Sequence, residues 1–186
     1  PRNEPDRTIG RSPSTNRSLF AITKSCQYEY GLYSKIAAYY PSFFSRVHEM
    51  SDLGDGTFKY VFERMTPLVD EEERVVNRIF NGYDLLKMVR LAFRFAIDSL
   101  FGLHLLHTQL GHVHSDISSR NIMWSLTDEV WKINDFDHSR PISQSLEIVR
   151  RGGGFAAPEV SGEEGGYFTT ASDVYSFGKV AYDLIA

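Results

Sequence analysis

Cysteine is almost absent from this chain of 186 residues, and no long stretch of it is free of ionisable side chains. The single cysteine, Cys26, cannot form a disulfide within the chain, which favours a reducing compartment such as the cytoplasm or the nucleus. The most apolar stretch, Leu85 to Leu106, is interrupted by charged residues, so it predicts a buried helix and not a membrane span. A net charge of −4 argues against general affinity for nucleic acid or for an anionic membrane.

Hydrophobic residues, at 42%, and aromatic residues, at 13%, are frequent enough to exclude a mostly disordered chain. Residues 1 to 18 are the exception, because they are rich in polar residues without periodicity, and we expect a flexible arm there. Leu19 to Thr23 predicts a short strand that ends at Lys24. From Tyr28 to Tyr40 apolar residues recur at helical intervals, and Pro41 is expected to end this helix.

A hairpin and two helices are expected in the middle of the chain. Phe43 to Met50 and Thr57 to Met65 flank Asp52 to Gly56, whose composition is typical of a hairpin turn. A charged helix is predicted over Asp70 to Phe80. Asp84 is a suitable N-cap for the long apolar helix that follows, which should lie deep because it is apolar on more than one face.

Two short segments carry acidic and amide side chains suited to phosphoryl transfer. The first runs from His114 to Asn121 and contains Asp116, and the second runs from Asp135 to Asp137. Phosphoryl transfer needs an acid group beside the attacking hydroxyl and oxygen ligands for magnesium on the phosphates. These residues supply such groups in the order and spacing of a protein-kinase catalytic loop and metal-binding motif.

Two later segments extend the resemblance. Ala157 to Glu159 is similar to the end of a kinase activation segment, and Asp173 to Gly178 is similar to the start of the next kinase helix. From residue 19 to residue 186 the chain resembles a protein kinase from its third strand onward. The residues at 116–118 and 135–137 also resemble, more narrowly, those of the fungal-specific protein-kinase-like families.

This resemblance implies a protein-kinase-like, two-lobed α+β fold. A reduced N-lobe sheet would occupy residues 19–65, and a mainly helical C-lobe would occupy residues 66–186. Relative to the family the chain is truncated at both ends and lacks the last C-lobe helices, so either the sequence is a fragment of a longer kinase or a partner covers the helix that begins near Ser172. Asp173 should accept hydrogen bonds from the backbone of the catalytic loop near His114.

The resemblance also implies catalytic roles. Asp116 would be the catalytic base, and Arg120 would supply a positive charge near the transferred phosphoryl group. Asn121 and Asp135 would bind magnesium, and ATP would be the phosphoryl donor.

Further positions are implied to bind the nucleotide. Glu63 and Met65 would lie on the hinge beside the adenine, behind a gatekeeper at Phe62, and Met123 would form the adenine floor. Lys24 and Glu29 would form the pair that orients the α and β phosphates, although only a short segment separates them.

Departures from the kinase pattern leave three functions open. The first is an ATP- and magnesium-dependent protein kinase acting on protein hydroxyls. The second is a pseudokinase that serves as a binding or decoy module, since only Gly10 stands where a phosphate-covering loop usually has three glycines. The third is a small-molecule phosphotransferase of the aminoglycoside or choline type, favoured by Ser118 and Asp137. Ser115 replaces the arginine that usually binds an activation-loop phosphate, so control by such phosphorylation is not expected, even though Ser139, Ser143 and Ser145 offer hydroxyls. The alternative is that Arg140, Arg150 or Arg151 takes the place of that arginine.

Overall fold

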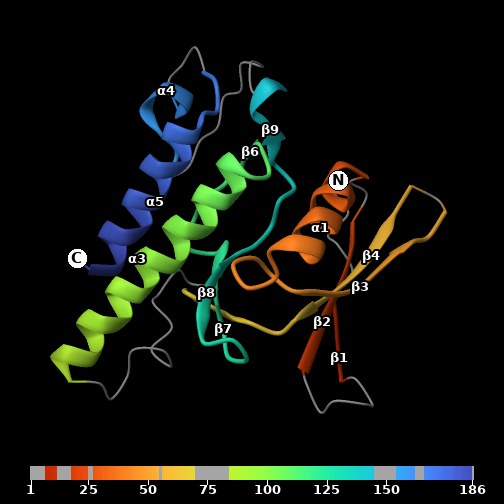
Figure 1. Cartoon of the computed structure of the whole chain (residues 1–186), viewed down its shortest axis with the longest axis horizontal. Coiled ribbons are helices and arrows are strands. Elements are labelled where there is room, and N and C mark those ends of the chain that lie inside the picture. The colour runs from red at the N-terminus through yellow and green to blue at the C-terminus, as the bar shows by residue number, and fades with distance from the viewer. Residues whose placement is uncertain are drawn as a thin grey trace.

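The computed structural model describes residues 7–11, 18–24, 27–54, 56–69, 84–144, 154–161 and 166–185, the backbone alone being described for residues before 31 and for residue 185. A four-stranded antiparallel sheet with one helix forms the first lobe (Figure 1). Its elements are β1 (Arg7–Arg11), β2 (Ser18–Lys24), α1 (Gln27–Tyr39), β3 (Val47–Asp52) and β4 (Phe58–Glu63), with the strands in the order β1-β2-β4-β3.

The predicted strand, helix and hairpin are all confirmed in this lobe. In the hairpin between β3 and β4, the Asp52 carboxylate accepts a hydrogen bond from the backbone N–H of Gly54 at 2.8 Å. Gly54 and Gly56 both have a φ of 82°, a conformation that side chains disfavour, which explains the glycines in this turn.

Strand β1 corrects the prediction of a flexible arm over residues 1 to 18 for the part that it occupies, residues 7–11, while residues 1–6 and 12–17 lie outside the described structure. Residues 7–11 pair antiparallel with β2, from Arg7 opposite Ile22 to Arg11 opposite Ser18. The pairing is made by backbone groups, which require no apolar periodicity in the sequence. Gly10 lies within this paired strand, opposite Leu19, and not in a loop between strands.

Long helices and short strands form the second lobe. Helix α3 (Leu85–Thr108) begins at the predicted cap, where the Asp84 carboxylate accepts from the N–H of Lys87 at 2.9 Å. Helix α5 (Thr170–Ile185) lies beside α3 (Figure 1). The remaining elements are β5 (Thr66–Pro67), β6 (His112–Val113), β7 (Ile122–Ser125), β8 (Val130–Ile133), β9 (Arg140–Pro141), the 3-10 helix η1 (Ile142–Gln144) and α4 (Pro158–Ser161). The charged helix predicted over residues 70–80 lies outside the described residues.

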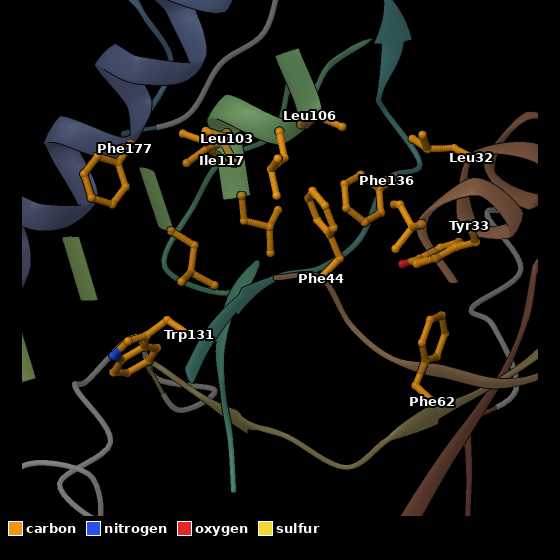
Figure 2. Packing of buried hydrophobic residues seen from close by; sticks show 14 of the residues in the cluster. Leu32, Tyr33, Phe44, Phe62, Leu103, Leu106, Ile117, Trp131, Phe136 and Phe177 are labelled. Carbon is orange, nitrogen blue, oxygen red and sulfur yellow. The ribbon is translucent and has the colours of Figure 1, made fainter. Parts of the chain in front are cut away.

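One hydrophobic core runs through both lobes. It extends from Phe177 on α5, through Leu106 on α3, to Phe44 and Phe136 and then to Tyr33 on α1 (Figure 2). Phe44, Phe136 and Tyr33 are all 0% exposed, and Tyr33 of α1 contacts the ring of Phe136, so the position of α1 depends on a ring contributed by the second lobe. Among the helices that the structure describes, none combines the length and apolarity needed to cross a membrane.

Helix α5 departs in part from the expectation that its apolar side chains need a covering partner. Phe177 and Val180 are buried against this chain's own core, with Phe177 stacked on Phe95 at a centroid distance of 5.6 Å. Val174 and Tyr182 are exposed, at 49% and 66%. The helix is therefore half covered by α3, and only its other face is free within the described structure.

Candidate active site

The loop between β6 and β7, residues 114–121, is anchored to the start of α5. The carboxylate of Asp173 accepts a hydrogen bond from the N–H of His114 at 2.7 Å and another from the N–H of Ser115 at 2.9 Å. The ring of His107 on α3 lies 2.9 Å from the same carboxylate. Asp173 is 1% exposed, so these bonds form away from water, where a carboxylate requires such partners. The prediction that Asp173 holds the backbone near His114 is confirmed.

The side chain of Asn121 contacts Asp116 within this loop. The side-chain N–H₂ of Asn121 donates to the main-chain oxygen of Asp116 at 2.8 Å and to its Oδ2 at 3.2 Å. The N–H of Asn121 also donates to the carbonyl of Ser118 at 3.0 Å, which closes the loop as a tight turn. The Asn121 amide therefore orients the Asp116 carboxylate and leaves its own Oδ1 oriented away from that contact.

The segment with Asp135 lies against the same loop. The N–H of Asn134 donates to the carbonyl of Asn121 at 2.9 Å, so Asp135 is one residue from a direct link to the loop. Asp135 has a φ of 65° and Ser115 a φ of 66°, and such left-handed backbone costs roughly 1–3 kcal/mol at a non-glycine residue. Within the described structure, strained backbone thus occurs in both predicted catalytic segments.

A magnesium ion would find few protein ligands here. No group of three histidine, cysteine or acidic side chains suited to a metal occurs among the described residues. Magnesium usually binds one or two protein oxygens together with substrate phosphates and water, so it does not need such a group. The carboxylate of Asp135 and the Oδ1 of Asn121 fit that mode of binding.

Aromatic rings in tilted and edge-on contact connect the loop of residues 114–121 to α1. His114 contacts Phe136 with a centroid distance of 5.1 Å, and Phe136 contacts Tyr33 edge-on at 5.2 Å. Nε2 of His114 donates to the carbonyl of Asn134 at 3.0 Å, while its Nδ1 accepts from the N–H of Asp116 at 3.2 Å. This pattern requires the neutral ring with its proton on Nε2.

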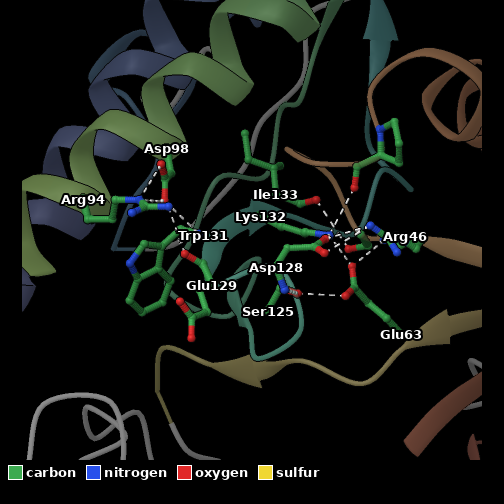
Figure 3. A network of polar contacts seen from close by, with 12 residues as sticks. Arg46, Glu63, Arg94, Asp98, Ser125, Asp128, Glu129, Trp131, Lys132 and Ile133 are labelled. Carbon is green, nitrogen blue, oxygen red and sulfur yellow. Dashed lines mark hydrogen bonds and ion pairs between the residues drawn. The ribbon is translucent and has the colours of Figure 1, made fainter. Parts of the chain in front are cut away.

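The side chain of Glu63 faces the protein interior. Its carboxylate lies 2.5 Å from Nζ of Lys132 and accepts hydrogen bonds from the hydroxyl of Ser125 at 2.9 Å and the N–H of Arg46 at 3.0 Å (Figure 3). The N–H of Glu63 donates to the carbonyl of Arg46. A contact between Glu63 and adenine would therefore be limited to its carbonyl oxygen, and its side chain belongs to a buried ionic network.

The other residues predicted to bind the nucleotide differ in how far they are buried. Phe62 is buried and packs against Tyr33 of α1 at 5.1 Å, and Met123 on β7 and Met65 after β4 are both partly exposed. Arg120 is exposed at the end of the loop. Lys24 ends β2 and Glu29 lies in the first turn of α1, but their side chains are outside the described structure, so their pairing stays a prediction.

Ser139 is not an accessible hydroxyl, which corrects the sequence-based expectation. It is 0% exposed, and its hydroxyl lies 3.5 Å from the carbonyl of His114. Ser143 in η1 is exposed, whereas Ser145 lies outside the described residues. Of these hydroxyls, Ser143 is the one that the structure shows at the surface.

Three residues that join the two lobes were missed by the sequence analysis, namely Tyr33, Lys132 and Asn134. Tyr33 was part of a correctly predicted helix, but nothing in its periodicity distinguishes a tyrosine that binds across the lobes from one that only packs. Lys132 and Asn134 lie in and just after a short strand. Their partners Glu63 and Tyr33 are 69 and 101 positions away, although Lys132 also pairs with Asp128 four positions before it. Such distant partners leave no local signal.

Together these features define a kinase-like architecture. A sheet with one helix is joined to a helical lobe, and the loop with Asp116 and Asn121 lies where the segment with Asp135 meets it. The Cydia pomonella granulovirus kinase PK-1 has this fold: its solved structure superposes with a TM-score of 0.68 over 95% of this chain and 62% of that chain, at 14% sequence identity.

The sequence comparisons then identify the family. A model of the protein kinase domain matches residues 77–186, more than half of the chain, so the chain belongs to the protein kinase domain family. Over 100 residues, or 50% of the chain, it is 33% identical to a probable serine/threonine-protein kinase of Dictyostelium discoideum. Over 85 residues, or 42% of the chain, it is 34% identical to the human Ephrin type-A receptor 5. The chain spans only 11% and 8% of the lengths of these two relatives.

Proposed function

We propose that this chain catalyses transfer of the γ-phosphoryl group of ATP to a protein hydroxyl, with magnesium as the required ion. The observation that carries the proposal is the position of Asn121. Its amide donates to Asp116, and its carbonyl accepts from the residue before Asp135. Asn121 therefore joins the other two groups needed for such a transfer, the carboxylate of Asp116 and the segment with Asp135, within a chain of the protein kinase family.

In this proposal Asp116 accepts the proton of the acceptor hydroxyl as the hydroxyl attacks. The hydrogen bond from Asn121 orients the carboxylate of Asp116. The hydrogen bond from the N–H of Ser115 to Asp173 fixes the backbone that leads to Asp116. Bound magnesium would neutralise charge on the phosphates, held by Asp135 and Asn121. Arg120, exposed beside them, would stabilise charge that develops on the transferred group.

Adenine would lie between Met123 and the carbonyl groups that follow Phe62. Such a site uses apolar contact for the base and backbone groups for its edge, which agrees with the engaged side chain of Glu63. Lys24 and Glu29 remain our candidates for orienting the phosphates. The relatives include serine/threonine-type and receptor-type kinases from an amoeba, plants and animals, and they give the fungal-specific resemblance no support.

The first prediction separates metal binding from proton transfer. Asp135→Asn should lose most of the magnesium-dependent part of ATP binding, because it removes a charged ligand. Asp116→Asn should keep that binding and lose transfer, because it removes only the proton acceptor, and general bases typically contribute roughly 10²–10⁴-fold. Calorimetry with ATP in magnesium and in EDTA measures binding, and labelled ATP with casein or histones measures transfer.

Asp183→Asn on the exposed part of α5 is the matched control, since it makes the same chemical change far from the loop. Equal ATP affinity of the wild type and Asp135→Asn in magnesium would contradict the metal role. Binding without transfer by the wild type would favour the pseudokinase. Transfer to choline or an aminoglycoside, but not to protein, would favour the small-molecule phosphotransferase.

A further inference from the structure

Asn134, the residue before the metal-binding candidate Asp135, uses both of its main-chain polar groups within the site. Its N–H donates to the carbonyl of Asn121, and its carbonyl accepts from Nε2 of His114. The peptide groups on either side of Asn134 are therefore fixed to the catalytic loop. This is the backbone that must hold Asp135 in its left-handed conformation.

The side chain of Asn134 points to three further elements. Its Oδ1 accepts from the hydroxyl of Tyr33 on α1 at 3.3 Å and from the hydroxyl of Ser45, just before β3, at 2.7 Å. Its Nδ2 donates to the sulfur of Met123 on β7 at 3.4 Å. One amide thus contacts the helix of the first lobe, the chain entering β3 and the predicted adenine floor.

Burial makes these contacts hard to replace. Tyr33 and Ser45 are both 0% exposed, so the hydrogen bonds of their hydroxyls to Asn134 form away from water. The Ser45 hydroxyl also lies 3.4 Å from the carbonyl of Ile133, which is the residue before Asn134. Loss of a hydrogen bond at a buried hydroxyl is costly, which favours the arrangement in which α1 and Asn134 stay together. The ring of Tyr33 also contacts Phe136, the residue after Asp135, so Asp135 is held from both sides by contacts with Tyr33.

We propose that Asn134 is a positioning residue that couples helix α1 to the metal-binding Asp135 and to the adenine-contacting Met123. The hydroxyls of Tyr33 and Ser45 are the links to the first lobe. This inference rests on the proposed function, because it assigns Asn134 to the same nucleotide site. It adds a residue, and a route between the lobes, that the catalytic motifs do not contain.

Two variants separate the contact of the Asn134 Oδ1 with Tyr33 from the contact of its Nδ2 with Met123. Tyr33→Phe removes one hydroxyl and keeps the ring, so it should weaken magnesium-dependent ATP binding roughly three- to tenfold and leave adenosine binding unchanged. Asn134→Ala also frees Met123, so it should weaken both ATP and adenosine binding. The double variant should bind ATP no more weakly than Asn134→Ala alone, because the hydroxyl no longer has its acceptor.

A second readout does not depend on nucleotide. In hydrogen exchange of the apo protein, Tyr33→Phe should speed exchange both in α1 and at residues 134–139, whereas a purely local role would change α1 alone. Ser176→Ala is the matched control, since it removes a buried hydroxyl whose bond to the Ser172 carbonyl lies within α5.

The outcomes are distinct. Unchanged exchange at residues 134–139 in Tyr33→Phe, or additive losses of ATP affinity in the double variant, would overturn the coupling. A wild type that binds no nucleotide, with the exchange result as expected, would overturn the proposed function while supporting the coupling. Equal losses in Ser176→Ala would show that the effect is general destabilisation and would also overturn the inference.

Discussion

At the scale of single residues, Lys132 is the most consequential side chain that lies away from the phosphoryl-transfer groups. It is 0% exposed, and its Nζ lies 2.5 Å from Glu63, 2.6 Å from Asp128 and 3.1 Å from the carbonyl of Pro41. Arg46 pairs with Asp128 at 3.0 Å, so two cations balance two carboxylates (Figure 3). This network joins the end of β4 to β8, the strand that leads to Asn134.

Lys132→Met should therefore destabilise the protein strongly. It leaves the buried carboxylate of Glu63 without its cation, and breaking such a pair costs about 3–5 kcal/mol. Urea unfolding gives the free energy directly. Lys59→Met is the control, because Lys59 meets Glu49 at 3.8 Å in an exposed pair worth about 0–1 kcal/mol. A loss for Lys132→Met as small as that for Lys59→Met would refute the role of the network.

His112 should make stability depend on pH. Burial lowers the pKa of His112 most strongly; the hydrogen bond to the carbonyl of Leu110 raises it in part, and the cation of Lys35 adds a smaller lowering effect. Nδ1 of His112 lies 2.5 Å from that carbonyl. A histidine with a lowered folded-state pKa binds its proton more readily when unfolded, so its stabilising contribution is complete above about pH 6.5 and declines below it.

The test compares urea unfolding of the wild type and His112→Asn at pH 7.5 and at pH 5.5. Asparagine keeps a donor near the position of Nδ1 but does not titrate, so this variant should lose less stability on acidification than the wild type. His104→Asn, on the exposed side of α3, controls for removal of an imidazole. Identical losses in the wild type and His112→Asn would contradict the assignment.

At the scale of elements, the segment after Asp135 is expected to work without phosphorylation. Ser115 occupies the position from which an arginine would bind a phosphate, and it is buried under α5 with its N–H on Asp173. Ser143 is exposed, and Arg140 on β9 is the exposed cation nearest to it in sequence. Ser143→Ala/Ser145→Ala should therefore keep most of the wild-type transfer rate, as should phosphatase-treated protein.

Labelled ATP measures transfer, and calorimetry confirms that nucleotide still binds. Ser161→Ala, an exposed hydroxyl in α4, controls for the loss of a surface serine. If both phosphatase treatment and the double alanine variant abolish transfer while ATP still binds, the segment is controlled by phosphate and Arg140 is a candidate to bind it.

The elements show which parts of the fold were predictable. Asp84 was identified as a cap, and the hairpin was identified from its turn, because each signal lies within a few residues of the structure it specifies. The bond from His114 to Asp173 was also predicted, although 59 positions separate the residues, because family spacing supplied the partner. Strand β1 and the contacts of Asn134 were not, since backbone pairing and isolated polar contacts leave no periodic pattern.

At the scale of the whole molecule, the chain buries one face of α3 and exposes another, so the prediction that this helix lies deep is wrong for its second apolar face. Phe95 is 1% exposed and packs on Trp131 and Phe177, whereas Phe93 and Ile97 are 66% and 63% exposed. Leu86, Val89, Leu100 and Phe101 are exposed on the same helix. Their spacing of three and four residues places a continuous apolar stripe on the outside of the second lobe.

This stripe should promote self-association of the chain without adding to the stability of its fold. Phe93→Gln/Ile97→Gln should lower binding of the dye ANS and lower self-association in analytical ultracentrifugation. The free energy of unfolding should stay within about 0.5 kcal/mol of the wild type, because exposed side chains contribute little to it. Phe95→Gln is the contrasting variant, since it places a polar group in the core and should cost about 3 kcal/mol or more. Strong destabilisation by the Phe93/Ile97 pair would mean that these side chains pack against the folded chain in solution, and that the apolar stripe is not free.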